Sequence, residues 1–502
     1  MEPAYSVRRK KPAKPSNFLE KIFLEQKLNN AVGYFLAFAI AGVFGYLIAE
    51  KTLIGLELFG AIIGFFVMLA CMLSTQAGFY IIMLYSFFAY WLNRLVFKEQ
   101  FQVGIVSDLL IYATFLSLII RRTEVRKNFS GFMKAPAIVA ILLYCCYLMV
   151  EVANPYAHSL EGWFQTFRRF LTCIVLLFIA YTVFSDYKAI RRYVVALFIL
   201  CTFAGFYGCV QQWHGFFDFE LNAIFSNKYG VVYINGGELR KFSTMSDPMS
   251  YGTVMAATAI LFLIIAVNQK IWKYRWLLIG GSLFMILGIV YSGTRTGNVM
   301  LVVGLALYCL LTFDRKSTKI FTAIAGFTFL FLLYVPIYSS GPLNRFRTSF
   351  QAKKDASYNV REENRKFIQP YIYSHPIGGG LCTTGEPGKR FNPGHYLAGF
   401  PPDSGYLRKA LETGWIGLIF IFVVYFITLQ SALRGYFTTR SPKRKLLYAA
   451  AFASLFSFYV AEFAQEALGQ ITDMVIYYPL IALIARLRHI DKASEEEERA
   501  LI

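Results

Sequence analysis

Long apolar runs recur along most of the 502-residue chain, and they constrain its fold more than any other feature. Runs of about 17–23 residues are long enough to cross the hydrocarbon core of a bilayer as α-helices. Hydrophobic residues make up 57% of the sequence and charged residues only 16%, which excludes an ordinary soluble protein of this size. We therefore predict an all-α, polytopic membrane helix bundle with about fourteen transmembrane helices. The predicted spans are 31–49, 54–73, 77–96, 104–120, 136–153, 170–184, 193–210, 249–267, 276–291, 298–313, 320–338, 411–431, 446–463 and 471–485.

The basic residues lie in alternate short loops between these spans. If both termini are cytoplasmic, every basic cluster falls on the cytoplasmic side, as the positive-inside rule requires. This topology accounts for the net charge of +20, so no nucleic-acid partner is expected. The first apolar run begins after residue 30 without an A-x-A-like site, and we expect no cleavable signal peptide. The clusters are 8–14, 121–127, 188–192, 270–275, 315–319, 434–445 and 486–492.

Two long loops, 211–248 and 339–410, fall on the outer side in this topology. Both are rich in aromatic residues, Gly, Pro and single charges, a composition that can fold, so we expect any chemistry there. Neither a Walker A motif nor a dinucleotide-type glycine loop is present, and the run GGG at 378–380 lacks the strand and helix context. The predicted organisation is a basic cytoplasmic tail (1–30), transmembrane helices (31–210), an outer loop (211–248), transmembrane helices (249–338), the large outer loop between helices 11 and 12 (339–410), transmembrane helices (411–486) and a cytoplasmic tail (487–502).

Several arginines on the outer side run against the positive-inside bias. Arg361 and Arg365 are four residues apart, so on a helix they share one face. A guanidinium keeps its charge and presents a fork that matches phosphate oxygens, which suits binding of a lipid diphosphate. The competing interpretation is that each pairs with a lipid headgroup or a local carboxylate. These arginines are Arg168, Arg169, Arg240, Arg295, Arg361 and Arg365.

Nothing in the sequence predicts a metal or another cofactor. There is no DxD motif, no CxxC spacing and no pair of histidines at ligand spacing. The arginines could take over the charge-neutralising role that a cation has in many transferases.

Four motifs resemble a known family. They are YGCVQQWHGF at the end of the seventh helix, RKFSTMSDPMSYG before the eighth, the turn YSGTRTG, and Arg361 fourteen positions before the His-Pro of SHPIGGG, followed by PPDSGYLRKALETGWIGL. In this order the chain resembles, over roughly 200–435, the O-antigen ligase and O-antigen polymerase superfamily. These are bacterial inner-membrane glycosyltransferases that use polyprenyl-diphosphate-linked glycans.

The resemblance implies a function and roles for residues. The donor would be an undecaprenyl-diphosphate-linked glycan, and the acceptor a hydroxyl of lipid A core or of a growing glycan, on the periplasmic face. Arg240 and Arg361 would bind the diphosphate, with Arg295 and Arg365 as second choices. His395 or Asp403 would be the base of a metal-independent, inverting transfer. Membrane lipids would be further partners, and the chain would lie in the bacterial inner (plasma) membrane.

Alternatives remain open at each of these points. Family ligases carry His-Asn where this chain has Asp403-Ser404. The activity of a polymerase therefore stays open beside that of a ligase. His395 could make a structural hydrogen bond in a turn, and Asp403 could cap a helix. Glu412 is expected to pair with Arg408.

Acidic groups near the spans also have two interpretations. Glu462, Glu466 and Asp473 could line a glycan cavity or the wet interface between helices. Acidic groups at membrane depth also support the alternative hypothesis of a polytopic transporter or flippase for lipid-linked glycan or another solute. Against that hypothesis, the two halves show no repeat of hydropathy.

Overall fold

The computed structural model describes residues 31–50, 52–99, 101–120, 122–226, 230–235, 237–336, 341–350 and 356–500. The chain forms two compact units, Met1–Leu69 and Ala70–Ile502. The first contains α2 (Ala31–Glu50) and most of α3 (Thr52–Leu73). The predicted basic tail, 1–30, lies outside the described residues.

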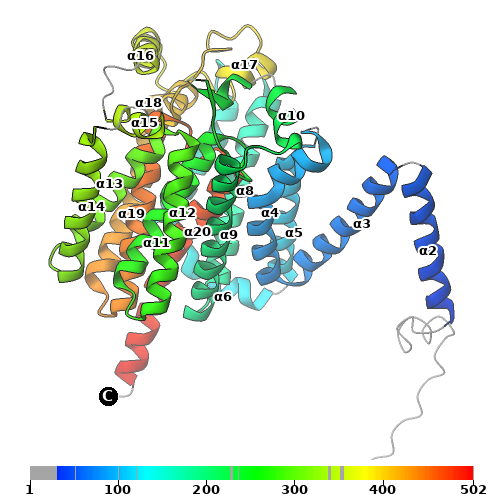
Figure 1. Ribbon diagram of the computed structural model, residues 1–502, viewed down its shortest axis with the longest axis horizontal. Helices are drawn as coiled ribbons and strands as arrows, with labels where there is room; N and C mark the ends of the chain where they lie inside the picture. The colour runs from blue at the N-terminus through cyan, green and yellow to red at the C-terminus, as the bar shows by residue number, and fades with distance from the viewer. Residues whose placement is uncertain are drawn as a thin grey trace, which may run out of the picture. The chain divides into compact units, whose positions relative to one another are not determined.

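The second unit is a bundle of helices (Figure 1). Its elements are α4 (Thr75–Phe97), α5 (Val103–Ile120), α6 (Arg122–Met133), α7 (Pro136–Val150), η2 (Glu151–Ala153), α8 (Leu160–Val183), α9 (Tyr187–Trp213), α10 (Asp218–Ser226), η3 (Gly230–Tyr233), β1 (Ile234–Asn235), β2 (Glu238–Leu239), α11 (Pro248–Asn268), α12 (Trp272–Ser292), α13 (Arg295–Leu311), α14 (Lys316–Tyr334), α15 (Gly341–Thr348), α16 (Ala356–Ser374), α17 (Gly385–Phe391), α18 (Gly405–Thr438), α19 (Pro442–Ala464) and α20 (Ile471–Ala500). The strands β1 and β2 form one short antiparallel pair.

The prediction of an all-α, polytopic membrane bundle is confirmed. Each predicted span overlaps a helix, and ten helices within the described residues are long and apolar enough to cross a membrane. Gly60–Leu73 and Arg295–Leu311 are shorter apolar helical stretches.

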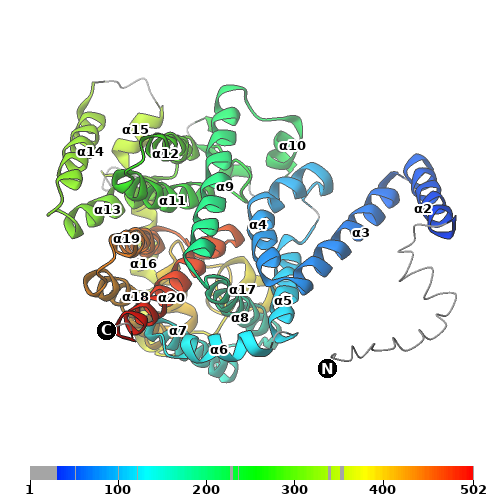
Figure 2. The ribbon, with the colours of Figure 1, turned by 90° about the horizontal axis from the view of Figure 1, so that it is seen from below.

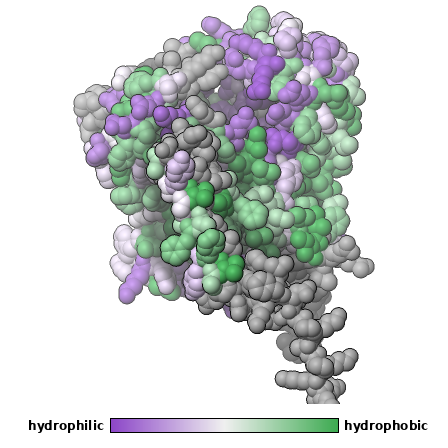
Figure 3. Space-filling view, turned by 90° about the vertical axis from the view of Figure 1, so that its right-hand side faces the viewer, coloured by the Kyte–Doolittle hydropathy of each residue, from purple (hydrophilic) through white to green (hydrophobic). Residues whose placement is uncertain are grey.

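The helices α10, α15, α16 and α17 gather at one end of the bundle, opposite α6 and the C-terminal part of α20 (Figure 1). We call this the outer end, because the predicted topology places its loops outside. Hydrophilic residues concentrate at this end, and hydrophobic residues cover the helices below it (Figure 3). This distribution is typical of a protein whose helices sit in lipid and whose polar loops sit in water.

The helix α11 packs against α12, α13 and α19 (Figure 2). Of its apolar span, 83% is buried, compared with 6% for α14 at the periphery. Small residues allow this close packing, as a Cβ at Gly252 would lie 2.7 Å from Ser292 Oγ.

Several boundaries differ from the sequence prediction. The sixth predicted span begins at 170, but α8 begins at Leu160, after Ser159 caps it by accepting from the Gly162 amide. Arg168 and Arg169 therefore lie inside the helix rather than at its start. The predicted tail 487–502 continues α20 as far as Ala500, since its Glu and Ala residues favour helix.

The helix α18 also begins before its predicted span, 411–431, because Ser404 caps it at Gly405. It contains a break at Gly414, where φ is 66°. The glycine run 378–380 packs on this break: the amides of Gly379 and Gly380 donate to the carbonyls of Leu411 (2.8 Å) and Glu412 (2.9 Å). The run GGG thus supplies close backbone packing to a broken helix.

Candidate functional site

The segment before α11 is held in place by α4 and α9. On α9, Gln211 Oε1 accepts from the amides of Phe242 (3.3 Å) and Ser243 (2.8 Å), and its Nε2 donates to Glu220 (2.7 Å). On α4, buried Arg94 donates to the Met245 carbonyl (2.7 Å). The motifs at the end of the seventh helix and the start of the eighth therefore form one unit.

This unit fixes Arg240. Its buried guanidinium donates from Nε to the Ser292 carbonyl (2.9 Å) and from Nη2 to Thr294 Oγ1 (3.0 Å). Both acceptors belong to the turn between α12 and α13, within the motif YSGTRTG. Burial, followed by the nearby charge of Arg345, lowers the pKa of Arg240 to about 10.

Four arginines lie close enough to repel one another. Arg240 is affected by the charges of Arg345 and Arg295, Arg345 by that of Arg295, and Arg295 by that of Arg361. We call Arg240, Arg295, Arg345 and Arg361 the arginine cluster. Like charges gathered at the outer end of a membrane bundle favour binding of a polyanion.

Sequence reasoning missed Arg345, on α15. Its Nη1 faces the Gly293 carbonyl at 3.5 Å, and its buried Nη2 has no hydrogen-bond partner within the described residues. Burial, followed by the charge of Arg295, lowers its pKa. The only signal was its position in the large outer loop, in NRFR (344–347), where no spacing distinguishes it from Arg347. Arg347 instead bonds the carbonyls of Leu332 and Val335 at the end of α14.

Arg361 and Arg365 share one face of α16, as their spacing predicts. Arg361 Nη1 donates to the Ala464 carbonyl (3.1 Å), and Arg365 Nη2 donates to the Phe463 carbonyl (2.8 Å). The Arg365 guanidinium also lies over the Phe463 ring, 4.5 Å from its centroid. Both therefore stabilise the C-terminus of α19, where cations complement the helix dipole.

His395 lies in a turn. Its Nδ1 accepts from the Leu397 amide at 3.1 Å, so the proton of the neutral imidazole is assigned to Nε2. Burial, followed by the charges of His158 and His375, lowers its pKa. These neighbours do not form a metal site, since the described residues contain no group of three or more His, Cys, Asp or Glu that could hold an ion.

Asp403 is half-buried and lies two residues before the start of α18 at Gly405. It accepts no hydrogen bond from any residue in the described part of the chain, and the cap of α18 is Ser404, whose Oγ accepts from the Leu407 amide (3.1 Å). The predicted capping role therefore belongs to Ser404.

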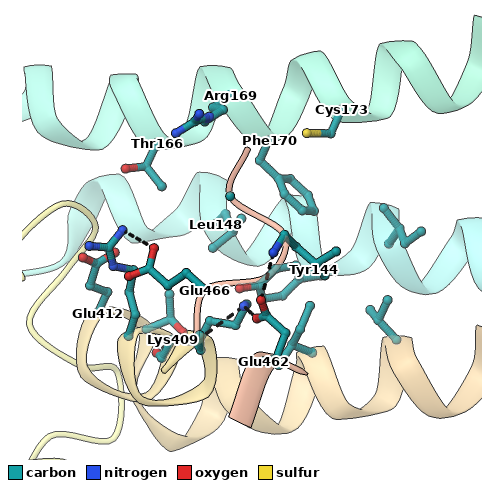
Figure 4. Close-up of a pocket in the computed structure, with 18 of the residues that line it drawn as sticks. Tyr144, Leu148, Thr166, Arg169, Phe170, Cys173, Lys409, Glu412, Glu462 and Glu466 are labelled. Carbon is teal, nitrogen blue, oxygen red and sulfur yellow. Dashed lines mark hydrogen bonds and ion pairs between the residues drawn. The ribbon is translucent and has the colours of Figure 1, made fainter. Parts of the chain in front are cut away.

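A cavity of about 210 Å³ lies between α7, α8, α18, α19 and α20, at the outer end (Figure 4). We call it the carboxylate cavity. Its charged lining residues are Arg169, Arg408, Lys409, Glu412, Glu462 and Glu466. Aromatic residues lie deeper, and they include Tyr144, Tyr425, Tyr477 and Tyr478.

The ion pairs in this cavity differ from the expected one. Arg408 pairs with Glu466 (2.8 Å) rather than with Glu412 on its own helix. Glu412 instead accepts from the hydroxyl of Thr384 and from its amide (3.4 Å). The prediction of an Arg408–Glu412 pair was wrong because a tertiary neighbour provides Glu412 with better donors.

Glu462 and Glu466 line the carboxylate cavity, and Asp473 precedes the lining residue Met474. Glu462 bonds Lys409 and accepts from the amides of Ala467 (2.8 Å) and Leu468 (3.1 Å). Burial raises the pKa of Glu466; Arg408 opposes this, while Glu412 and Glu462 add to it. Asp473 is buried beside the cavity, and its Oδ1 has no partner in the part of the chain that the structure describes.

A comparison with protein families supports the resemblance. Residues 280–422 match the sequence model of a family described as O-antigen ligase. This region contains Arg295, Arg345, Arg361, His395 and Asp403, whereas Arg240, Glu462 and Glu466 lie outside it. It is narrower than the range 200–435 expected from the motifs. No curated protein matches the chain.

Proposed function

We propose that this membrane protein, which carries an O-antigen ligase domain at residues 280–422, is a surface-polysaccharide glycosyltransferase. It moves a glycan from an undecaprenyl-diphosphate donor to an acceptor hydroxyl on the periplasmic face of the bacterial inner membrane. The observation that carries the proposal is the arginine cluster at the outer end of the bundle.

The arginine cluster suits the donor diphosphate. Guanidinium forks make charge-assisted, bidentate bonds to phosphate oxygens, and such bonds are the strong ones. Burial, followed by the charge of a neighbouring arginine, lowers the pKa values of Arg240 and Arg345, and a bound anion would offset both effects. The same charges would stabilise the diphosphate as it leaves, without a metal ion. Arg365 supports the site by holding α16 on α19.

In a single displacement, the acceptor oxygen bonds to the anomeric carbon while the bond from that carbon to the diphosphate oxygen breaks. The configuration inverts, and the acceptor proton passes to a base. His395 and Asp403 are the candidates from the sequence. For His395 to act, Nδ1 would have to give up the Leu397 amide, whereas Asp403 accepts no hydrogen bond from the residues that the structure describes.

Ligase and polymerase share this chemistry and differ in the acceptor, which is lipid A core for one and a growing glycan for the other. Asp403-Ser404, in place of the family's His-Asn, slightly favours a polymerase.

The test uses a deletion strain whose surface glycan is compared on a gel with strains complemented by wild type, Arg345→Ala, Arg361→Ala or His395→Ala. Lys366→Ala, an exposed residue on the same helix as Arg361, is the matched control and should restore the glycan. Single repeat units left on the acceptor indicate a polymerase. Loss of long glycan with accumulation of lipid-linked polymer indicates a ligase. The surface glycan of the deletion strain must be examined under conditions where the protein is normally expressed and no paralogue substitutes for it. An unchanged glycan there contradicts the proposal and favours the transporter hypothesis.

A further inference from the structure

We propose that the carboxylate cavity binds the acceptor sugar and that Glu466 is the base that takes the proton of its hydroxyl. This inference rests on the proposed function and identifies where its second substrate is held.

The lining of the cavity suits a saccharide. Carboxylates and guanidinium groups at its outer end can bond hydroxyls, and tyrosine rings deeper in the cavity can pack against the apolar face of a sugar ring. Arg169, on α8, lines the cavity and makes no hydrogen bond or ion pair with any described residue. Its donors are therefore available to a ligand.

Of the three glutamates, Glu466 is the one best able to accept a proton. Both oxygens of Glu462 are engaged, one by Lys409 and the other by two backbone amides. Glu412 is 6% exposed and holds Thr384. Glu466 has a side chain 33% exposed, and its one ion pair within the described part of the chain, with Arg408, uses Oε2. Oε1 makes no hydrogen bond within the described residues, so it is open to a hydroxyl.

The position of Glu466 relative to the arginine cluster fits an attack on the donor. Arg361 bonds the carbonyl of Ala464, two residues before Glu466. Because consecutive Cα atoms are about 3.8 Å apart, the Cα atoms of Ala464 and Glu466 are separated by at most about 7.6 Å. The segment from the end of α19 into the loop before α20 thus contacts Arg361 of the arginine cluster and also contains the cavity residue Glu466.

The environment of Glu466 favours its role as a base. The charges that act on it are those of Arg408, Glu412, Glu462 and Lys409. The other titratable residues that line the cavity are Arg169, Tyr144, Cys173, Tyr425, Tyr477 and Tyr478. Burial and two glutamates raise the pKa of Glu466, and a raised pKa makes a carboxylate a stronger base. In the reaction the Glu466 carboxylate takes the proton of the acceptor hydroxyl and becomes a carboxylic acid. The acceptor oxygen forms a bond to the anomeric carbon, the bond from that carbon to the diphosphate oxygen breaks, and undecaprenyl diphosphate leaves.

The experiment uses the purified full chain in nanodiscs, with an undecaprenyl-diphosphate-linked oligosaccharide as donor and the corresponding glycan acceptor. Glu466→Gln keeps the size of the side chain and removes the base. We expect the turnover number to fall at least about 100-fold, with the donor Kd unchanged and the acidic limb of the pH profile lost. Glu466→Asp, which keeps the carboxylate, should restore part of the rate. Glu386→Gln, an exposed residue on α17, is the matched control and should behave as wild type.

A second variant tests the cavity as the acceptor site. Arg169→Gln should raise the acceptor KM and leave the donor Kd unchanged. Wild-type turnover and pH profile in Glu466→Gln would overturn the assignment of the base while the proposed function stands. An equal loss of donor binding in Glu466→Gln would make its role structural and also overturn it. Absence of transfer by the wild-type protein would overturn the proposed function and the inference together.

Discussion

Gly405 leaves the space that the carboxylate of Glu462 occupies, and a Cβ at this position would collide with Glu462 Oε2. The carboxylate would have to leave Lys409 and the amides of Ala467 and Leu468. We therefore predict that Gly405→Ala lowers the free energy of unfolding by about 1–3 kcal/mol, the usual cost of overpacking. Thermal unfolding in detergent checks this.

The matched control for this variant is Gly280→Ala on α12, where nothing lies within 4 Å of the new Cβ. Alanine is a better helix former than glycine, so the control should be neutral or slightly stabilising. Equal melting temperatures for the two variants would contradict the steric argument.

Gln211 positions Arg240 through the backbone of Phe242 and Ser243. Gln211→Leu leaves these two amides without their acceptor and removes one of the donors to Glu220, which keeps Tyr207 and the Phe217 amide. Each buried polar group left unsatisfied costs about 1–3 kcal/mol. We expect a lower melting temperature and weaker donor binding, although Gln211 itself touches no diphosphate. Gln212→Leu, the exposed neighbour, should change neither quantity. Normal donor affinity in Gln211→Leu would show that Arg240 does not depend on this support.

The sequence predicts the helices well because their signal is local. An apolar run of sufficient length can only be satisfied as a helix in lipid, so each predicted span overlaps one. Arg240 and Arg361 could be selected because their loop positions contradict the positive-inside rule. Arg345 lies in the same outer loop as Arg361, but the sequence does not distinguish it from Arg347, since its importance comes from the approach of α15 to the α12–α13 turn. Similarly, Arg408 pairs with Glu466 rather than with Glu412 because of how the chain folds around α19. The i,i+4 spacing on one helix cannot predict a partner from another segment.

Arg345 offers a test that separates stability from function. Burial, followed by the charge of Arg295, lowers the pKa of Arg345 and so disfavours its protonated form. We predict that Arg345→Gln leaves the melting temperature of the free protein unchanged or raises it. Its affinity for undecaprenyl diphosphate should fall by about 10–100-fold, because a hydrogen bond to a charged group contributes about 1.5–3 kcal/mol. Loss of both stability and affinity would point to a structural role instead.

The lowered pKa of Arg240 predicts the pH dependence of donor binding. In the proposed function its protonated form binds the diphosphate, so affinity should be full below this pKa and should fall as the pH rises through about 10. The decline should reach about tenfold per pH unit, since one proton is lost. The diphosphate is already fully ionised there, because a phosphate loses its second proton near about pH 6. Binding of undecaprenyl diphosphate measured from pH 7 to 11, with Arg240→Gln as the variant that should remove this step, checks the prediction. Unfolding across the same range must be monitored in parallel.

His395 can be tested by replacing its hydrogen bond without its proton chemistry. The Oδ1 atom of an asparagine can accept from the Leu397 amide as Nδ1 does, but it cannot serve as a base. If Glu466 is the base, His395→Asn retains most of the transferase activity, while His395→Ala loses stability through the broken turn. Turnover and melting temperature of the two variants decide the matter. A loss of at least about 100-fold in turnover for both, at unchanged melting temperature, would return the role of base to His395.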